Sequence, residues 1–425
     1  MRFYIETYGC QMNTADSELV SDILLKAGFE QTQDIDDAGL LIFNTCTVRQ
    51  HAENRVLGRI ASEKQRKQTQ PGLKIAVIGC VAQKMGEMLI ELENGIDYVV
   101  GVDQYQLLPE LLAHDTGIQT TENHAQLYQE LHPRHQNPRS AYVTITRGCD
   151  NFCSYCIVPY VRGRERSLPP GWILDEVRKC GESGRKEVTL LGQNVNSYCY
   201  GDYDFPRLLS ELNGIDSIYR LRFLSSHPKD LSDQLIETMV TGNMICPQIH
   251  LPLQSGDDHI LQAMNRKYKL EHYLGLVDKL RKAMPDIAIT TDILIGFPGE
   301  TELMFQNTIK AMQEIRFDYA FCFKYSPREQ TAAAKMGDQV PEIERLRRLQ
   351  TTIELQREIT RQKYQEQIGK FVEVYVESLS RRSAKQVAGK TRSGKIAVLA
   401  GNEQDLGHLK TARVASATGG TLICD

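Results

Sequence analysis

The sequence predicts an α/β protein in three parts: an N-terminal domain built on a parallel sheet, a central partial (β/α)6 barrel and a small C-terminal all-β barrel. Apolar strands alternate with amphipathic helices through the first part, which is typical of a parallel sheet. Strand–helix units repeat through the second part, and short strands bounded by Gly, Ser and Asn fill the third. The length of 425 residues agrees with two or three domains.

The composition excludes several protein classes. A hydrophobic content of 41% and a charged content of 24% are ordinary for a soluble globular chain. No apolar run approaches the roughly 18 residues of a membrane span, and MRFYIETYGC lacks a signal-peptide core, so we expect a cytoplasmic protein with no membrane partner. Eleven cysteines, an odd number in a reducing compartment, favour metal or redox use over disulfides.

The N-terminal domain, residues 1–117, contains three cysteines in equivalent places. RFYIETYGC, LLIFNTC and LKIAVIGC predict strands, while SELVSDILLKAG and EMLIELENG predict helices. Cys10, Cys46 and Cys80 each stand just past the end of one of these strands. Because the carboxyl ends of parallel strands meet at one edge of a sheet, we expect the three to converge. The alternative is three separately buried cysteines that act as small apolar side chains.

Residues 118–134 are polar and predict a linker, and residues 135–366 predict the partial barrel. The expected strands are AYVTITRG, KEVTLLGQN, RLRFLSSHP, PQIHLPLQSG, IAITTDILIGFPGE and DYAFCFKYSP. The expected helices are WILDEVRKCGESG, FPRLLSELNGI, LSDQLIETMVTG, YLGLVDKLRKAM and ELMFQNTIKAMQEI. Six units are too few to close an eight-stranded barrel, so an open form is expected.

Polar residues at the strand ends of this barrel are candidates for ligand contact. Gln193 and Asn194 end the second strand, Gln254 and Ser255 end the fourth, and Asp292 lies in the fifth. The carboxyl ends of the strands form the functional face of such barrels. The alternative for each residue is a structural role in a loop.

A charged helix is expected from Glu342 to Gln367, and residues 367–425 predict the small β-barrel. Its expected strands are FVEVYVES, QVAGKTR, KIAVLAG and HLKTARVASA. From Ile368 onward there are nine Lys and Arg and five Asp and Glu, a net charge of +4. Because the whole chain carries −4, residues 1–367 carry −8. Such a basic tail on an acidic body favours a polyanionic partner.

Cys149, Cys153 and Cys156 follow the first barrel strand in the pattern C-x3-C-x2-C. Structural zinc sites usually close with four ligands, which makes zinc the weaker interpretation. An iron–sulfur cube held by three thiolates fits the spacing better, because its fourth iron stays open. The amino and carboxylate groups of S-adenosylmethionine (SAM) can chelate such an iron. The pattern therefore predicts a [4Fe–4S] cluster that binds SAM.

This cysteine pattern, with Tyr155 before its last member, resembles the radical SAM signature. Together with the three N-terminal cysteines and a C-terminal barrel like the TRAM domain, essentially the whole chain resembles the radical SAM methylthiotransferases. One branch of that family acts on prenylated adenosine in tRNA. The stretches that are similar to this branch are TYGCQMN, FNTCTVRQHAENRV, GCVAQ, LLGQNVNSY, SSHP, HLPLQSG and DILIGFPGET.

The resemblance implies two [4Fe–4S] clusters, a radical SAM cluster on Cys149, Cys153 and Cys156 and an auxiliary cluster on the three N-terminal cysteines. It implies that SAM is both methyl donor and source of a 5′-deoxyadenosyl radical, and that C2 of N6-dimethylallyladenosine at position 37 of tRNA is methylthiolated. An electron donor is needed, and sulfur comes either from the auxiliary cluster or from a separate donor. The residues expected to contact SAM are Tyr155, Gln193, Asn194, Gln254, Ser255 and Asp292.

The expected macromolecular partner is a tRNA anticodon stem-loop. Three arginines flank the cysteine loop and six basic residues cluster in the tail domain, where they would meet phosphates. These residues are Arg162, Arg164 and Arg166 in the first group and Arg381, Arg382, Lys385, Lys390, Arg392 and Lys395 in the second. The other cysteines show no ligand spacing and are expected to be structural.

Other functions compete with this one. Within the family, the substrate could be N6-threonylcarbamoyladenosine of tRNA or an aspartate of a ribosomal protein. The basic tail argues against a basic ribosomal protein, and an apolar prenyl group needs an uncharged cavity whereas a carboxylate needs a cation. From another class, a non-enzymatic iron–sulfur or zinc protein that binds RNA is the alternative.

Overall fold

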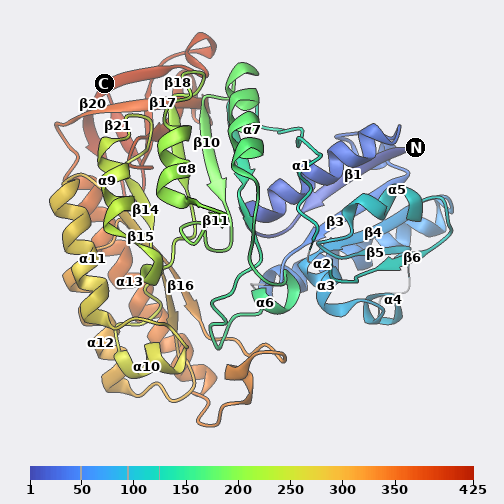
Figure 1. Cartoon of the computed structure of the whole chain (residues 1–425), viewed down its shortest axis with the longest axis horizontal. Helices are drawn as coiled ribbons and strands as arrows, with labels where there is room; N and C mark the ends of the chain where they lie inside the picture. The colour runs from blue at the N-terminus through green and yellow to red at the C-terminus, as the bar shows by residue number, and fades with distance from the viewer. Residues whose placement is uncertain (48–49, 93–94, 124) are drawn as a thin grey trace.

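The computed structural model describes residues 1–47, 50–92, 95–123 and 125–425. It confirms the predicted fold class: an N-terminal α/β domain, a partial barrel in the middle and a C-terminal β-barrel (Figure 1). Val48 and Arg49 of the FNTCTVRQHAENRV stretch, and Glu93 and Asn94 of the EMLIELENG helix, lie outside the described residues. None of the described helices combines the length and the apolar character needed to cross a bilayer.

The N-terminal domain contains a six-stranded, all-parallel sheet in the order β2-β1-β3-β4-β5-β6. Its strands are β1 (Arg2–Thr7), β2 (Glu30–Gln31), β3 (Leu40–Thr45), β4 (Lys74–Gly79), β5 (Tyr98–Val100) and β6 (Gly117–Gln119). Its helices are α1 (Gln11–Lys26), α2 (Gln50–Lys64), α3 (Cys80–Met85), α4 (Met88–Leu92) and α5 (Leu108–Leu111). β6 carries the sheet to Gln119, past residue 117 where the sequence places the end of the domain.

Helix α1 begins earlier than the sequence predicts. The periodic apolar pattern starts at Ser17, yet the helix starts at Gln11, directly after Cys10. Its first turns are polar, which hides them from a pattern search, but Asn13 and Asp16 are fully buried. These side chains are buried because they hold the loops that carry the cysteines. The early start of α1 therefore marks the edge of the sheet where the cysteines lie.

The partial barrel consists of two three-stranded parallel sheets, β7-β10-β13 and β14-β15-β16, joined by a bridge between Leu221 and Ile245. The strands are β7 (Ser140–Thr144), β10 (Glu187–Leu191), β13 (Arg220–Phe223), β14 (Gln248–His250), β15 (Ala288–Ile295) and β16 (Tyr319–Lys324). The helices are α7 (Pro170–Glu182), α8 (Phe205–Leu212), α9 (Asp233–Thr241), α10 (Asp258–Ala263), α11 (Leu270–Ala283) and α12 (Glu302–Ile315). All of these were predicted except α10.

The apolar core of the barrel lies between the strands and the outer helices, as residues such as Val188, Leu190 and Ile289 show. β16 is the last strand of its sheet. Beside it runs α13 (Glu342–Gln365), where Gln356 donates to the carbonyl of Phe317 at 3.0 Å and Thr360 to that of Asp318 at 3.1 Å. The backbone edge of the sheet is therefore covered while the barrel stays open.

The C-terminal domain is a closed barrel in the order β17-β18-β19-β21-β20. Its strands are β17 (Phe371–Ser380), β18 (Ser383–Thr391), β19 (Ile396–Ala400), β20 (Leu409–Ala417) and β21 (Leu422–Cys424), of which only β21 was missed by the sequence. Two buried arginines of β13 bind it: Arg220 donates to the carbonyl of Lys390 at 2.6 Å, and Arg222 to that of Thr391 at 2.8 Å. The small barrel thus covers the amino ends of the central strands.

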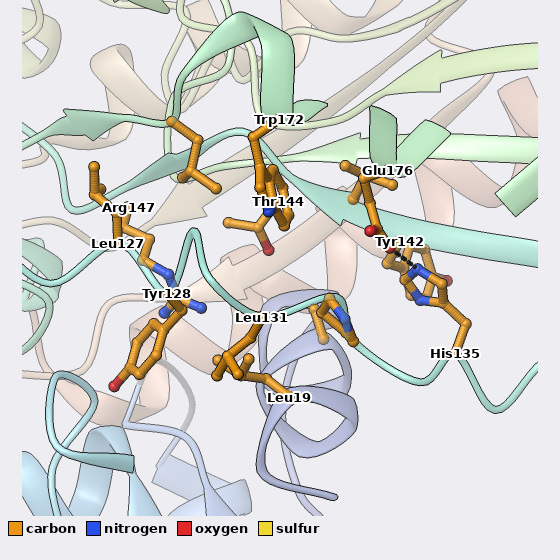
Figure 2. A pocket seen from close by; sticks show the side chains of 14 residues that line it. Leu19, Leu127, Tyr128, Leu131, His135, Tyr142, Thr144, Arg147, Trp172 and Glu176 are labelled. Atoms are coloured by element: carbon orange, nitrogen blue, oxygen red, sulfur yellow. Dashed lines mark hydrogen bonds and ion pairs between the residues drawn. The ribbon is translucent and has the colours of Figure 1, made fainter. Parts of the chain in front are cut away.

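His135 links α1 of the N-terminal domain to α7 of the partial barrel. Its Nδ1 lies 2.8 Å from Glu18 Oε2 and its Nε2 lies 3.0 Å from Glu176 Oε1, and all three side chains are buried. Figure 2 shows His135 and Glu176 pointing toward each other beside Tyr142. Burial by itself lowers the pKa of His135, but hydrogen bonds to Cys180, Glu176 and Glu18 outweigh it and raise the pKa to about 11.

We expect this link to weaken as pH rises. The pKa of His135 is higher in the folded chain than its ordinary value of 6.5, so its stabilisation is complete below pH 6.5 and declines as pH rises toward 11. Urea unfolding at about pH 6.5 and about pH 10 should show the loss. His135→Ala should cost about 3 kcal/mol at the lower pH, because it removes the cation between two buried carboxylates, which among the described residues keep only His132 and the amide of Gln136 as partners. His135→Arg, which stays charged, should lose less stability between the two pH values; an equal loss would contradict the assignment.

Candidate functional site

Six cysteines from two domains line one cavity of about 340 Å³ at the carboxyl ends of the barrel strands. Three come from the edge of the N-terminal sheet and three from the loop after β7. The cysteines are Cys10, Cys46, Cys80, Cys149, Cys153 and Cys156. The convergence expected from the topology of each domain is therefore present, and the two sets also face each other across one space.

The N-terminal cysteines sit on loops that a buried amide network holds. Asn13 donates to Asn44 Oδ1 at 3.0 Å and to the carbonyl of Thr45 at 3.1 Å, and Asn44 donates back to the carbonyl of Asn13 at 2.8 Å. The Asn13 side chain also accepts from the amide of Cys10 at 3.3 Å. The carboxyl ends of β1 and β3 are thus fixed relative to each other, which fixes Cys10 and the loop after β3.

Two glycines let the cysteine loops approach closely. Gly79 has a φ of 90°, and a Cβ there would lie 2.5 Å from Asn44 Oδ1 and 2.6 Å from the carbonyl oxygen of Thr45. Gly9 has a φ of 148°, and a Cβ there would lie 2.6 Å from Cys46 Cβ. Each glycine directly precedes a cysteine, so the fold needs a residue without a side chain at both positions.

The loop from Cys149 to Cys156 is fastened to the turn after α10. Ser154 donates through its amide to the carbonyl of Met264 at 3.0 Å and through its hydroxyl to that of Ala263 at 2.7 Å. Asn265 donates to the carbonyl of Phe152 at 2.8 Å, and Phe152 has a φ of 44°. Sequence reasoning missed α10 and this turn, because the short helix has no long apolar pattern.

One buried arginine accompanies each set of cysteines. Arg162 Nε lies 3.2 Å from Cys80 Sγ, and Arg266 Nη1 lies 3.4 Å from Cys153 Sγ. Hydrogen bonds and positive charge next to sulfur stabilise thiolates and tune the clusters they bind. Arg266 was not identified from the sequence, since a lone arginine distant from the motif gives no signal.

The expectation that Arg162 contacts tRNA is wrong on structural grounds. Arg162 is buried, and its Nη2 lies 2.8 Å from Asp16 Oδ2 on α1. Arg147 pairs with the other oxygen of Asp16 at 3.1 Å. A guanidinium used in this way offers no surface to a phosphate.

The thiols differ in acidity. A hydrogen bond from Cys46 lowers the pKa of Cys10 to about 6, assisted by Arg162 and by the amides of Asn13 and Met12, although burial opposes the shift. Burial raises the pKa of Cys149 to about 11 and that of Cys156 to about 12. Buried thiols of this kind lose their protons when a metal takes their place. The donor set therefore fits iron–sulfur ligation.

Three of the described residues that line the same cavity carry polar atoms without hydrogen-bond partners. Within the described ranges, Gln193 Oε1, Asn194 Oδ1 and Ser226 Oγ are buried and accept or donate no hydrogen bond. Because unpaired buried polar groups are unfavourable, these atoms indicate a polar ligand. Ser226 was not predicted. Gln254 and Asp292 also line the cavity, and Gln254 has a φ of 71°, a strained conformation of the kind found at binding sites.

Ser255 does not reach the cavity, which corrects the sequence expectation. Its hydroxyl lies 3.2 Å from Thr308 Oγ1 and accepts from the amide of Asp257 at 3.2 Å. The residue is buried behind the loop. Its position after β14 is as predicted, but its side chain points away from the functional face.

A second cavity, of about 410 Å³, adjoins the first and is largely apolar. The two share Tyr155, Cys156, Val158, Gln254 and Asp292 as lining residues. The other walls are formed by residues of β15, β16, the loop after β16 and α13, among them Leu294, Phe323, Tyr325 and Leu349. The cysteine loop thus opens on one side to polar groups and on the other to an apolar chamber.

The remaining basic residues fall into two groups. Arg164 is exposed beside Asp150, whereas Arg166 is mostly buried and pairs with Asp103 at 3.0 Å. In the tail, Arg381, Arg382 and Lys385 are exposed near the turn between β17 and β18.

The other three tail residues of the predicted set have structural partners. Burial of Lys395 corrects the expectation for that residue, whereas RNA contact by Lys390, whose side chain is 42% exposed, and by Arg392 stays a prediction. Lys390 pairs with Glu377 at 3.0 Å, and Lys395 is buried against Asp318 at 2.6 Å. Arg392 donates to the carbonyl oxygen of Asn243 at 2.6 Å and to that of Ile245 at 3.0 Å.

Residues 2–101 match the family described as Uncharacterized protein family UPF0004, and residues 143–312 match the radical SAM superfamily. A tRNA-2-methylthio-N(6)-dimethylallyladenosine synthase from Thermoanaerobacter sp. (strain X514) is 44% identical over 99% of this chain and 91% of its own length. One from Clostridium novyi (strain NT) is 45% identical over 98% of this chain and 94% of its own. The chain belongs to this synthase family. The family prediction is confirmed.

Solved structures support the fold that this synthase family adopts. The radical S-adenosylmethionine methyltransferase TsrM from Kitasatospora setae, with cobalamin and a [4Fe-4S] cluster bound, superposes with a TM-score of 0.62. The match covers 78% of this chain and 77% of that one at 14% identity. The cobalamin-dependent radical enzyme OxsB gives 0.55 over 84% of this chain and 56% of its own, at 10% identity. At such identities the likeness concerns the fold alone.

Gly79→Ala tests how tightly the edge with the cysteines is built. The new Cβ would clash with Asn44 and Thr45, and the positive φ adds strain, so we expect a loss of about 2 kcal/mol or more. Thermal unfolding is the measurement. Gly72→Ala is the matched control, because no atom lies within 4 Å of its Cβ and its φ is not positive. Equal losses of stability from the two substitutions would show that the fold does not need the close contact between Gly79 and the Asn44–Thr45 segment.

Proposed function

We propose that this protein is a tRNA-2-methylthio-N(6)-dimethylallyladenosine synthase: a radical SAM enzyme that places a methylthio group on C2 of N6-dimethylallyladenosine at position 37 of tRNA. The observation that carries the proposal is the single cavity lined by six cysteines from two domains. Relatives of nearly full length bear this name. C2 of adenine is not activated toward acid–base chemistry, so a site made of thiols rather than of a proton-transfer pair suits the task.

Two [4Fe–4S] clusters fit the two sets of cysteines. Cys149, Cys153 and Cys156 would hold the first, and the N-terminal cysteines would hold the second. When bound, the clusters and SAM supply one-electron chemistry and sulfur, which no side chain of the chain provides. The chain itself contributes the charge balance: Arg266 donates to Cys153 and Arg162 to Cys80. An electron donor is part of this proposal, and either the second cluster or an external donor supplies sulfur.

The residues proposed to contact SAM lie on both sides of the cysteine loop. The unpaired Gln193 and Asn194 oxygens suit its amino group, and the apolar second cavity, bounded by Tyr155, Gln254 and Asp292, suits its adenosine. This arrangement would place the sulfonium between the two cavities, where both border Cys156. Tyr155 and Val158 line both cavities at that junction.

The charge of the first cavity favours a prenylated base over one with a carboxylate. Its two arginines are already engaged, Arg162 by Asp16 and Arg266 by the carbonyl of Pro252 and the hydroxyl of Tyr268. Burial, with Arg266 and Lys229 nearby, lowers the pKa of His227 to about 2, so this residue is neutral. Among the described residues that line this cavity, a threonylcarbamoyl carboxylate would find neither arginine unpaired.

For the RNA surface we propose Arg381, Arg382, Lys385 and Arg164, the exposed members of the predicted basic set. The three tail residues lie near one turn, so they present one face to a phosphate backbone. They lie on the small barrel that packs against β13, while Arg164 lies beside the cysteine loop. An anticodon stem-loop that contacts both would cross the open side of the partial barrel.

Substitutions in the two sets of cysteines should abolish different steps of the reaction. We expect about eight irons per chain in the anaerobically reconstituted protein, and about four after Ala replaces Cys149, Cys153 and Cys156 or after it replaces the three N-terminal cysteines. The first variant should form no 5′-deoxyadenosine from SAM, because it lacks the cluster beside the SAM site. The second should still form it while making no methylthiolated product.

Cys199→Ala is the control for these variants, since Cys199 is exposed on β11 (Cys199–Tyr200) and lines neither cavity. Undiminished 5′-deoxyadenosine from the first variant, or full methylthiolation by the second, would contradict the assignment of that set.

The substrate is tested with three anticodon stem-loops that carry adenosine, N6-dimethylallyladenosine or N6-threonylcarbamoyladenosine at position 37. Mass spectrometry of the digested nucleosides should find a methylthio group on the prenylated base, with at least tenfold less product from the other two. Comparable turnover of the threonylcarbamoylated stem-loop would instead assign the protein to that branch of the family.

A further inference from the structure

Strand β16 carries three aromatic residues in alternate positions, Tyr319, Phe321 and Phe323, which we name the aromatic stripe. Tyr319 is 48% exposed and Phe321 is 41% exposed, unusual values for large apolar side chains on a strand of a central sheet. The rings form a row: those of Tyr319 and Phe321 are 4.9 Å apart, and those of Phe321 and Phe323 are 6.5 Å apart and nearly parallel at 7°. The row is therefore continuous along one face of the strand.

The aromatic stripe faces the inside of the open barrel. The ring of Phe321 meets that of His250 on β14 edge to face at 6.0 Å, and His250 lines the cysteine cavity, where it lies 3.5 Å from Asp292. Phe323, near the carboxyl end of β16, lines the second cavity. The outward-facing Ala320 is buried in the core instead. The exposed rings thus lead into the site rather than away from it.

The amino end of the aromatic stripe, at Tyr319, reaches the C-terminal barrel. Asp318, directly before Tyr319, pairs with Lys395 at the start of β19 at 2.6 Å. The stripe therefore spans the distance from the domain proposed to hold the RNA backbone to the cavity proposed to hold the target base. The rings of Tyr319 and Phe321 are left exposed along this path.

We propose that the aromatic stripe is a stacking platform for the unpaired bases next to the adenosine that is modified. This inference rests on the proposed function. The target base must leave the stack of the anticodon loop to enter the cavity, and its neighbours then lose a stacking partner. Aromatic side chains replace such partners, at about 1–3 kcal/mol per base, and accept any base because every base has a π-face.

The occupant is RNA and not an apolar protein segment because of the polar groups interleaved with the rings. Thr290 and Asp292 on β15 stand beside Tyr319 and Phe321 in the strand register, and His250 contacts Phe321. Stacked bases present apolar faces and polar edges together, which matches rings flanked by hydrogen-bonding groups. Thr290, His250 and Asp292 bond one another, and an apolar peptide would offer no partner to their remaining hydrogen-bonding capacity, whereas the edges of bases do.

The test uses the reconstituted protein and a prenylated anticodon stem-loop with 2-aminopurine, a base whose fluorescence falls on stacking, beside position 37. Phe321→Ala and Tyr319→Ala should each weaken binding by about 5- to 100-fold. The fluorescence that binding quenches in the unsubstituted protein should stay high in Phe321→Ala. Phe321→Trp should restore both affinity and quenching, because it keeps an aromatic face. Leu303→Ala, which removes an exposed apolar side chain from α12, should change neither.

The outcomes separate this inference from the function on which it rests. Failure of the unsubstituted protein to bind the stem-loop would overturn both. Binding by the unsubstituted protein, with equal affinity and quenching in Phe321→Ala, would overturn the aromatic stripe alone. Unchanged RNA binding together with lost reduction by a protein electron donor would assign the stripe to that donor and overturn the RNA platform.

Discussion

The ion pair between Asp16 and Arg162 holds the two halves of the site together. Asp16 belongs to the first helix of the N-terminal domain and Arg162 to the segment after the cysteine loop of the barrel, yet their charged atoms lie 2.8 Å apart with no exposure of Asp16. Removing one member of such a pair leaves a buried charge and costs about 3–5 kcal/mol. Arg162 also donates to Cys80, so one side chain fixes the domain interface and a thiol together.

This constraint explains why the polar start of α1 is buried. Asn13 bonds Asn44 and Thr45 of its own domain, and Asp16 pairs with Arg147 and Arg162 of the barrel. Packed against the barrel, the same residues order the loops around Cys10 and hold Arg162 in place. The charges cross the domain boundary, so the cavity between the two sets of cysteines exists only in the assembled chain.

The parts of the fold that depend on periodicity could be read from the sequence. Six barrel strands, five of their helices and the convergence of Cys10, Cys46 and Cys80 follow from alternation and strand order alone. The role of Arg162 could not be read, because a charge run looks the same whether it faces solvent or a buried carboxylate, and Arg266 gave no signal because it lies far from the motif. Ser255 failed for a related reason: strand order places a residue at a face but does not set its side-chain direction.

The contacts between the partial barrel and the C-terminal domain have a consequence for how the chain can vary. Arg220 and Arg222 donate to the carbonyl oxygens of Lys390, Thr391 and Arg392, groups that every amino acid supplies. These contacts therefore depend on the path of the backbone, while a few side chains of the small barrel, Glu373, Arg392 and Lys395, add contacts at the same joint. The outer face of the small barrel is free to change in sequence, and so to be matched to different nucleic acids, while the domain stays seated at the same angle.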